Sequence, residues 1–201
     1  MNALAATVAS PSADSRKQQL LEAALGVFAR HGYRKTSMDD VAQAAGVSRQ
    51  GLYLHFETKE DLFREAVHHS IRQAHAAVDT ALEVTDTSLE ERLVAAFDAF
   101  IGRHCDSVGA DVDDLMSACQ TLLGPTLQTE KKAFAKRIAT AIEDAGVSAA
   151  HDRGNITPKD LAQTLCATAY GLKQMQMTRQ GFVAAMRTAV RAFGLSGRSS
   201  R

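Results

Sequence analysis

Apolar residues recur at helical spacing along most of the chain from about residue 15 onward. Met38, Val41, Ala42 and Ala45 lie at positions i, i+3, i+4 and i+7, so they share one face of a helix. Similar stripes run through residues 20–28 and 62–71. The chain has only 3 prolines and few clusters of β-branched residues, which argues against a β fold. The pattern therefore predicts an all-α protein.

Residues that cap helices precede several of these stripes. Pairs at capping-box spacing are Ser37 with Asp40, Thr58 with Asp61, and Ser88 with Glu91. Thr157 stands before Pro158, and proline is favoured at the first helical position. We expect later helices near residues 59–82, 88–106, 111–123, 125–145, 157–176 and 178–194. We expect breaks at Gly32, at Gly46, near Asp86, at residues 107–111, at Gly124-Pro125 and at residues 146–156.

The stripes divide the chain into two helical domains. Three short helices form a small domain over residues 15–60, and a helical domain follows over residues 61–195. Residues 1–14 are expected to be a flexible leader, and residues 196–201 a flexible tail. The helix that begins at Lys59 and runs to about Leu82 is long enough to leave the first domain and enter the second.

Residues 37–56 meet the steric demands of a helix-turn-helix. Ala42 is the small residue where the two helices touch, Gly46 is the turn residue that takes a positive φ, and Ser48 caps the second helix. The apolar residues around the joint are Val41, Ala45, Val47 and Leu52. A plain helix–glycine–helix corner in an all-α protein meets the same demands, so spacing alone leaves that alternative open.

Polar residues in the first turn of the second helix point to DNA. In a helix-turn-helix this turn enters the major groove, where Arg49 suits guanine and Gln50 suits adenine. Gly51 would let the backbone approach closely. Tyr53, His55 and Lys59 suit the flanking phosphates, as do Thr36 and Ser37 at the start of the preceding helix. The candidate DNA-binding residues are therefore Thr36, Ser37, Ser48, Arg49, Gln50, Gly51, Tyr53, His55 and Lys59.

Residues 16–67 resemble the DNA-binding domain of TetR-family transcriptional regulators. The matching positions are Phe28, Gly32-Tyr33, Thr36, Val41-Ala42, Ala45-Gly46-Val47-Ser48, Gly51, Tyr53, His55-Phe56, Lys59 and Leu62. Val41 replaces the commoner isoleucine, and Arg49-Gln50 is a pair particular to this chain. The rest of the chain matches the family only in length and helical layout.

The resemblance implies a homodimer with about nine helices per chain, whose last two helices pair with their copies in a four-helix bundle. Two recognition helices would then read a palindromic double-stranded operator. The interface residues that this implies are Leu161, Leu165, Ala169, Leu172, Phe182, Met186, Val190 and Phe193. The alternative is that these two stripes belong to the chain's own core.

The resemblance also implies a small-molecule effector bound in the second domain. The candidate lining residues are Phe97, Phe100, His104, Met116, Gln120, Tyr170 and Gln174, with Leu115, Leu122 and Met175 beside them. They suggest an apolar or mixed ligand over a highly charged one. For the methionines and phenylalanines, a place in the ordinary core is the alternative.

Charge and cysteine usage narrow the remaining choices. The chain has 23 Lys and Arg against 23 Asp and Glu, so DNA contact must come from a local surface and not from the overall field. Residues 14–36 supply such a local excess, with five basic residues against two acidic ones. The 3 cysteines show no paired motif, and no signal peptide or membrane span is expected, so a reducing cytoplasm is the simplest location.

Rival chemistries find little support in the residues. His68, His69 and His75 lack the i, i+4 spacing of a helical metal site, and the acids near residues 111–114 lack a calcium loop. No catalytic motif is found, so we expect no enzyme activity, cofactor or metal. A DNA-binding regulator without a ligand, an activator, and a helical enzyme or interaction module with an incidental corner remain as alternatives.

Overall fold

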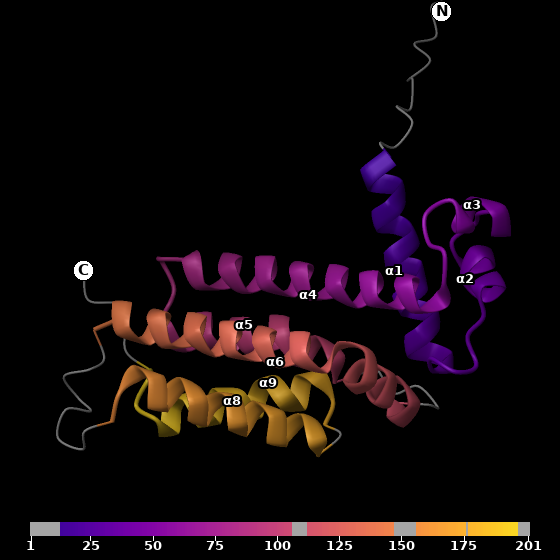
Figure 1. Cartoon of the computed structure of the whole chain (residues 1–201). Coiled ribbons are helices and arrows are strands. Elements are labelled where there is room, and N and C mark those ends of the chain that lie inside the picture. The colour runs from indigo at the N-terminus through magenta and orange to yellow at the C-terminus, as the bar shows by residue number, and fades with distance from the viewer. Residues whose placement is uncertain (1–12, 106–111, 147–155, 176, 197–201) are drawn as a thin grey trace, which may run out of the picture.

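The computed structural model describes residues 13–105, 112–146, 156–175 and 177–196 (Figure 1). This part of the chain holds eight α-helices, one short 3-10 helix and no strand, which confirms the all-α fold. The elements are α1 (Ala13–His31), α2 (Met38–Ala44), α3 (Arg49–Tyr53), α4 (Lys59–Glu83), α5 (Leu89–Phe100), the 3-10 helix η1 (Gly102–His104), α6 (Val112–Asp144), α8 (Pro158–Gln174) and α9 (Arg179–Ala192). The expected leader, the tail and most of the breaks at 107–111 and 146–156 lie outside the described residues.

The helix starts follow the predicted caps. Ser37 accepts a hydrogen bond from the Asp40 N–H at 3.2 Å, and the Asp40 carboxylate accepts from the Ser37 N–H at 2.8 Å. Reciprocal boxes of the same kind begin α5 and α8, and Thr58 caps α4. Each box satisfies N–H groups that have no partner within the helix. These starts are therefore set by local sequence.

Two separate apolar cores hold the molecule together. The N-terminal core is built by α1, α2, α3 and the first part of α4, around the fully buried Phe28 and Phe63. The C-terminal core joins the end of α4 to α5, α8, α9 and the second part of α6, around Phe97 and Phe134. Figure 1 shows α4 running from the small N-terminal unit along the whole bundle. This helix therefore contributes buried residues to both cores.

The break expected at Gly124-Pro125 is wrong, because α6 continues through Pro125 as one helix. An internal proline costs roughly 3 kcal/mol through its missing N–H and its ring. Packing on both sides offsets that cost: Leu123 is 2% exposed in the N-terminal core, and Ile138 is fully buried in the C-terminal core. The helix is thus a second connection between the cores, made by a segment far from α1–α3 in sequence.

The structure confirms two further expected breaks and moves the end of one expected helix. Gly32 and Gly46 have φ values of 79° and 66°, so the breaks predicted there are confirmed. The helix expected over residues 88–106 ends earlier, at Phe100, and passes into η1.

None of the described helices has the length and apolarity needed to cross a membrane.

Candidate nucleic-acid interface

The joint between α2 and α3 has the expected geometry. Val41 and Leu52 are fully buried, and Ala42 is buried between the helices. The chain reverses at Gly46 in the left-handed region, where the Val47 N–H donates to the Ala42 carbonyl at 3.0 Å. This closes the turn and brings α3 across α2. The motif is therefore a helix-turn-helix.

The start of α3 depends on two neighbouring small residues. The hydroxyl of Ser48 accepts a hydrogen bond from the Gly51 N–H at 3.0 Å, which caps the helix. A Cβ added at Gly51 would lie 3.2 Å from that hydroxyl oxygen. The glycine keeps the cap unstrained as well as leaving the backbone open to a close approach. Both residues lie where the sequence predicted them to act.

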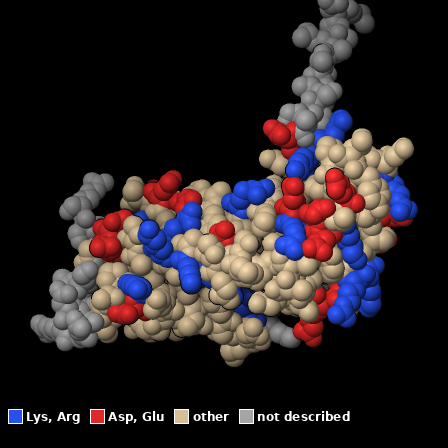
Figure 2. Space-filling model, viewed as in Figure 1, with Lys and Arg blue, Asp and Glu red and all other residues tan. Residues whose placement is uncertain are grey.

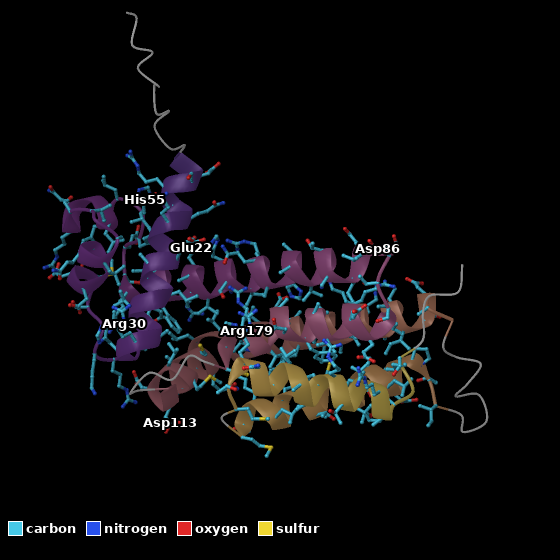
Figure 3. The ribbon with its side chains drawn as sticks, turned by 180° about the vertical axis from the view of Figure 1, so that it is seen from behind. Glu22, Arg30, His55, Asp86, Asp113 and Arg179 are labelled. Carbon is cyan, nitrogen blue, oxygen red and sulfur yellow. The ribbon has the colours of Figure 1, made fainter. Side chains whose placement is uncertain are left out.

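The outer face of α3 is exposed. Ser48, Arg49, Gln50 and His55 are exposed side chains, and Tyr53 is 41% exposed. Figure 3 shows His55 in the helix-turn-helix unit, on the side remote from α8 and α9. No part of the described fold covers this face, so it is available to a duplex.

Leu54 is a candidate contact that the sequence interpretation missed. It is 85% exposed and lies one helical turn after Gln50. An apolar side chain on a groove-facing helix can contact the methyl group of thymine. The signal that would have found it is its i+4 spacing from Gln50, which places both on one face.

Arg49 is held in place by its neighbours. Its Nη1 atom donates to Asp39 Oδ2 at 2.9 Å, and its guanidinium lies 5.6 Å from the Tyr53 ring centroid. The contact with Tyr53, together with the charge of Asp39, raises the pKa of Arg49 above its usual value. The arginine is thus fully charged and linked to α2, so any outside partner of its guanidinium would compete with Asp39.

Lys59 is bonded to carbonyl groups within the chain. Its Nζ atom donates to the carbonyl oxygens of Tyr33 at 3.1 Å, Arg34 at 3.3 Å and Thr36 at 3.0 Å. It also lies 4.6 Å from the centroid of the Tyr33 ring. Three carbonyl acceptors occupy the three ammonium donors. In the structure Lys59 thus holds the loop before α2, and the phosphate contact expected of it stays a prediction.

Thr36 is a correction to the expected contacts. Its side chain is 2% exposed, and its hydroxyl donates to the Gly32 carbonyl at 2.7 Å. The side chain is thus used inside the domain and is not available to a phosphate. Ser37 remains at the surface, although its hydroxyl is engaged in the cap with Asp40. Of this pair only Ser37 stays a candidate contact.

The basic excess of residues 14–36 is partly paired within the chain. Lys17 lies 2.8 Å from Glu65, and Arg34 Nε lies 3.2 Å from Asp114 at the start of α6. The Arg34 N–H also donates to Asp114 at 2.7 Å. Figure 2 shows basic and acidic side chains side by side at the end of the molecule that α1, α2 and α3 form. The basic excess of residues 14–36 is thus offset by neighbouring acids.

Several expected effector residues do not come together. Met116 is 50% exposed, and Gln120 and Gln174 are exposed, so none of the three lines an interior site. The reason is that the first part of α6 turns its apolar side toward the N-terminal core, where Leu115 and Leu122 pack. Met175 is 71% exposed as well. This part of the prediction is wrong.

The remaining effector candidates lie in the C-terminal bundle. Phe97 is fully buried, and Phe100 stacks on Phe134 with ring centroids 4.2 Å apart, which places both in ordinary core packing. The Tyr170 hydroxyl is buried and has no hydrogen-bond partner among the described residues. Burial, with nearby Lys173 and Arg103, lowers the pKa of His104 to about 4. Only Tyr170 and His104 keep the character of binding groups.

The two stripes expected at a dimer interface belong to the chain's own core. The buried members of that core are Leu161, Leu165, Ala169, Phe182, Met186 and Val190, with Leu172 and Phe193 packed against it. The six buried members are therefore used within one chain, as the alternative interpretation had it, and an interface role for the partly exposed Leu172 and Phe193 stays a prediction. The outward sides of α8 and α9 instead carry small exposed residues, among them Ala167, Gly171 and Ala184.

The histidines of α4 make ordinary polar contacts. His69 Nε2 lies 3.4 Å from Glu22 of α1, and His75 Nε2 lies 2.6 Å from Glu130 of α6. Across the described ranges, no three His, Cys, Asp or Glu side chains are placed to hold a metal ion.

Comparison with known proteins places the similarity in the N-terminal unit. Residues 20–66 match the tetR family of bacterial regulatory proteins. The transcriptional activator FasR of Mycolicibacterium smegmatis is 40% identical over 87 residues, which cover 43% of this chain and 39% of FasR. An acrEF/envCD operon repressor of Escherichia coli is 49% identical over 49 residues, which cover 24% of this chain and 22% of the repressor.

The likeness in structure extends further than the likeness in sequence. A TetR-like transcriptional regulator from Rhodococcus sp. RHA1 has a TM-score of 0.64 at 23% identity, covering 92% of this chain and 99% of that chain. By sequence, the chain spans less than half the length of the curated relatives that it matches. The helix-turn-helix is thus supported by sequence and the helical bundle by fold.

Proposed function

Given that the chain is a TetR-family transcriptional regulator by its DNA-binding domain and its fold, we propose that it binds a palindromic operator as a homodimer in the cytoplasm and represses transcription. A small molecule bound between the helices of the bundle releases it from DNA. Blocking a promoter needs only tight binding across it, which two linked recognition helices supply.

The exposed face of α3 is the observation that carries this proposal. Arg49 and Gln50 have the donor and acceptor groups that read guanine and adenine, and the described fold leaves both uncovered. Gln50 is exposed on this turn, and Arg49 is linked only to the exposed Asp39 and Tyr53, so both side chains can turn to an outside partner. We therefore expect this turn to bind in the major groove of DNA.

The dimer is assigned to the outward sides of α8 and α9. Gly171 lies inside α8, where glycine costs roughly 1 kcal/mol relative to alanine. A Cβ added there would meet nothing within 4 Å, so no contact within the described chain requires the glycine. Close approach of a helix from a second copy would explain it, with Ala167 and Ala184 beside it.

Two helices give the bundle a mechanical link to the DNA-binding unit. Both α4 and α6 contribute buried residues to both cores. Arg64 of α4 donates to the Leu122 carbonyl of α6, and Arg34 pairs with Asp114. A ligand that binds one relative position of α4 and α6 more tightly would shift the spacing of the two recognition helices.

Selection of bound sequences from a pool of random DNA tests the proposal with the full chain. The expected result is one enriched palindrome, whose half-sites lie about one helical turn apart or slightly more. The Arg49→Ala variant should lose the preference at one base in each half-site. A pool without an enriched palindrome would overturn the proposal.

Activation is the second candidate, because FasR is named as an activator. Transcription in vitro from a promoter carrying the selected operator separates the two. If the chain represses, transcript falls as protein is added, and if it activates, transcript rises. A ligand-independent regulator would give the same transcript level with and without any small molecule screened.

A further inference from the structure

A groove of about 610 Å³ lies between α4 and α6, where the two cores meet. His68, Arg72 and His75 line it from α4, and Thr126, Glu130 and Arg137 line it from α6. The two helices run side by side (Figure 1), and Figure 2 shows both basic and acidic side chains over them. The groove is therefore polar and lies between the two helices that connect the cores.

The acids of the groove are already bonded. Asp79 lies 2.7 Å from Arg137 Nε, and Glu130 lies 2.6 Å from His75 Nε2. Arg72 is exposed, and no hydrogen bond or ion pair joins it to another described residue. The Arg72 guanidinium, on the α4 side of the groove, therefore has no counter-charge among the described residues.

Two imidazole nitrogens in the groove lack partners. His68 Nε2 and His75 Nδ1 are buried atoms without a hydrogen bond in the described part of the chain. The side chain of His75 is only 13% exposed, so bulk water does not readily replace a partner. A buried polar atom without a hydrogen-bond partner is destabilising, and a ligand atom could supply the missing bond.

We propose that this groove binds a small monocarboxylate. One carboxylate oxygen accepts a hydrogen bond from the Arg72 guanidinium, and the other accepts from the N–H at His68 Nε2. The bond to the guanidinium is charge-assisted, and a single unpaired arginine balances a single negative charge. Ile71 and Ala76 also line the groove, and they offer an apolar surface to a short hydrocarbon body.

The position of the groove gives the ligand a route to DNA binding; this step rests on the proposed function. Ile71 lines the groove and Leu127 follows Thr126, and both pack against the N-terminal core, whereas Phe134 and Ile138 of α6 lie in the C-terminal core. A carboxylate held by Arg72 and facing Thr126 and Glu130 ties α4 to α6 where the two cores meet. The bound carboxylate thereby favours one relative position of α4 and α6.

The test titrates the full-length protein, without DNA, with sodium hexanoate, sodium acetate and inorganic phosphate. Imidazole signals in NMR spectra report where each probe binds. Hexanoate should shift the signals of His68 and His75 in a saturable way and leave His31 and His55 unmoved. Acetate should bind more weakly, because it lacks the apolar body.

Variants decide whether the groove is the site. Arg72→Ala should raise the Kd for hexanoate about tenfold or more, as loss of a charge-assisted pair implies. Lys136→Ala removes a charge from an exposed position of α6 that does not line the groove, and should leave the Kd within about twofold. Absence of the two shifts, or an unchanged Kd in Arg72→Ala, would overturn the proposal. Tighter binding of phosphate than of hexanoate would overturn the carboxylate assignment.

Failure here is distinguishable from failure of the proposed function. Hexanoate binding is measured without DNA, so it stands or falls independently of operator selection. An operator may be selected while hexanoate saturates the groove without changing operator affinity. In that case the groove is a carboxylate site, but its proposed effect on DNA binding is wrong.

Discussion

The ammonium nitrogen of Lys59 lies 3.0 Å from the carbonyl oxygen of Thr36. Its bonds to Tyr33 and Arg34 join the first residue of α4 to the whole loop that leads into α2. The start of the connecting helix is thus attached to the start of the helix-turn-helix. A movement of α4 would be passed directly to the DNA-binding unit.

Replacing Lys59 by methionine keeps the aliphatic stem and removes the three donors. We expect the free energy of unfolding to fall by roughly 1 kcal/mol, because three carbonyl groups, two of them partly buried, lose a charged partner. Urea denaturation measures this, with the exposed Lys132→Met as control. The salt dependence of operator binding should keep its slope. A slope reduced by about one with unchanged stability would instead make Lys59 a phosphate contact.

Arg49 and Asp39 give opposite predictions for DNA binding. Arg49→Ala should weaken operator binding by roughly 1–3 kcal/mol and relax one base preference. Asp39→Asn should strengthen binding, because it frees the guanidinium and removes a negative charge beside the duplex. Fluorescence anisotropy with operator and single-base variants measures both. Equal base preference in Arg49→Ala and the native chain would place α3 outside the groove.

Local chemistry made the helix-turn-helix predictable. The Ser37/Asp40 box and the positive φ of Gly46 depend on residues within a few positions of each other. Burial of Val41 and Leu52 follows from spacing on the helix. The face of α3 that these buried residues leave exposed could therefore be identified from the sequence, and so could its candidate DNA contacts.

Long-range contacts made the rest unpredictable. Charge gives Lys59 a preference for negative partners, but it does not distinguish a phosphate from three carbonyl groups. The stripe through Leu165 and Met186 shows that one face of each helix is buried, but not which chain covers it. Nor does the sequence near Pro125 reveal that cores on both sides hold α6 together.

Leu123 tests the link between α6 and the DNA-binding unit. Leu123→Ala removes a side chain that is 2% exposed in the N-terminal core and should cost roughly 2–5 kcal/mol. Hydrogen exchange should accelerate in α1 and α2, although the substitution lies far away in sequence. Thr121→Ala, at an exposed site on the same helix, is the control. Unchanged hydrogen exchange in α1 and α2 would show that the packing of Leu123 does not stabilise the N-terminal core.

Gly171 tests the dimer. Gly171→Leu should leave helix content and folding intact, because its Cβ meets nothing within the chain, yet it should block close approach of a second copy. Sedimentation should then show a chain of 21.6 kDa where the native protein shows twice that mass. Gly26→Leu is the matched control, since Gly26 lies within α1 and its Cβ also meets nothing within 4 Å. A dimeric Gly171→Leu variant would move the interface elsewhere.

His104 predicts a loss of stability in mild acid. Burial lowers its pKa to about 4, whereas an unfolded histidine titrates near 6.5. Below about pH 6.5 the unfolded chain therefore binds a proton that the folded chain does not, and the free energy of unfolding falls until about pH 4. Between pH 6.5 and 5 the loss from this residue is at most about 2 kcal/mol.

Urea denaturation at pH 7 and pH 5 measures that loss. His104→Gln should lose less stability than the native chain over the same range, because glutamine takes up no proton. His55→Gln, at an exposed position, should keep the native pH dependence. If His104→Gln and the native chain lost the same free energy, the imidazole would have to be protonated in the fold, and its burial beside Lys173 would need another explanation.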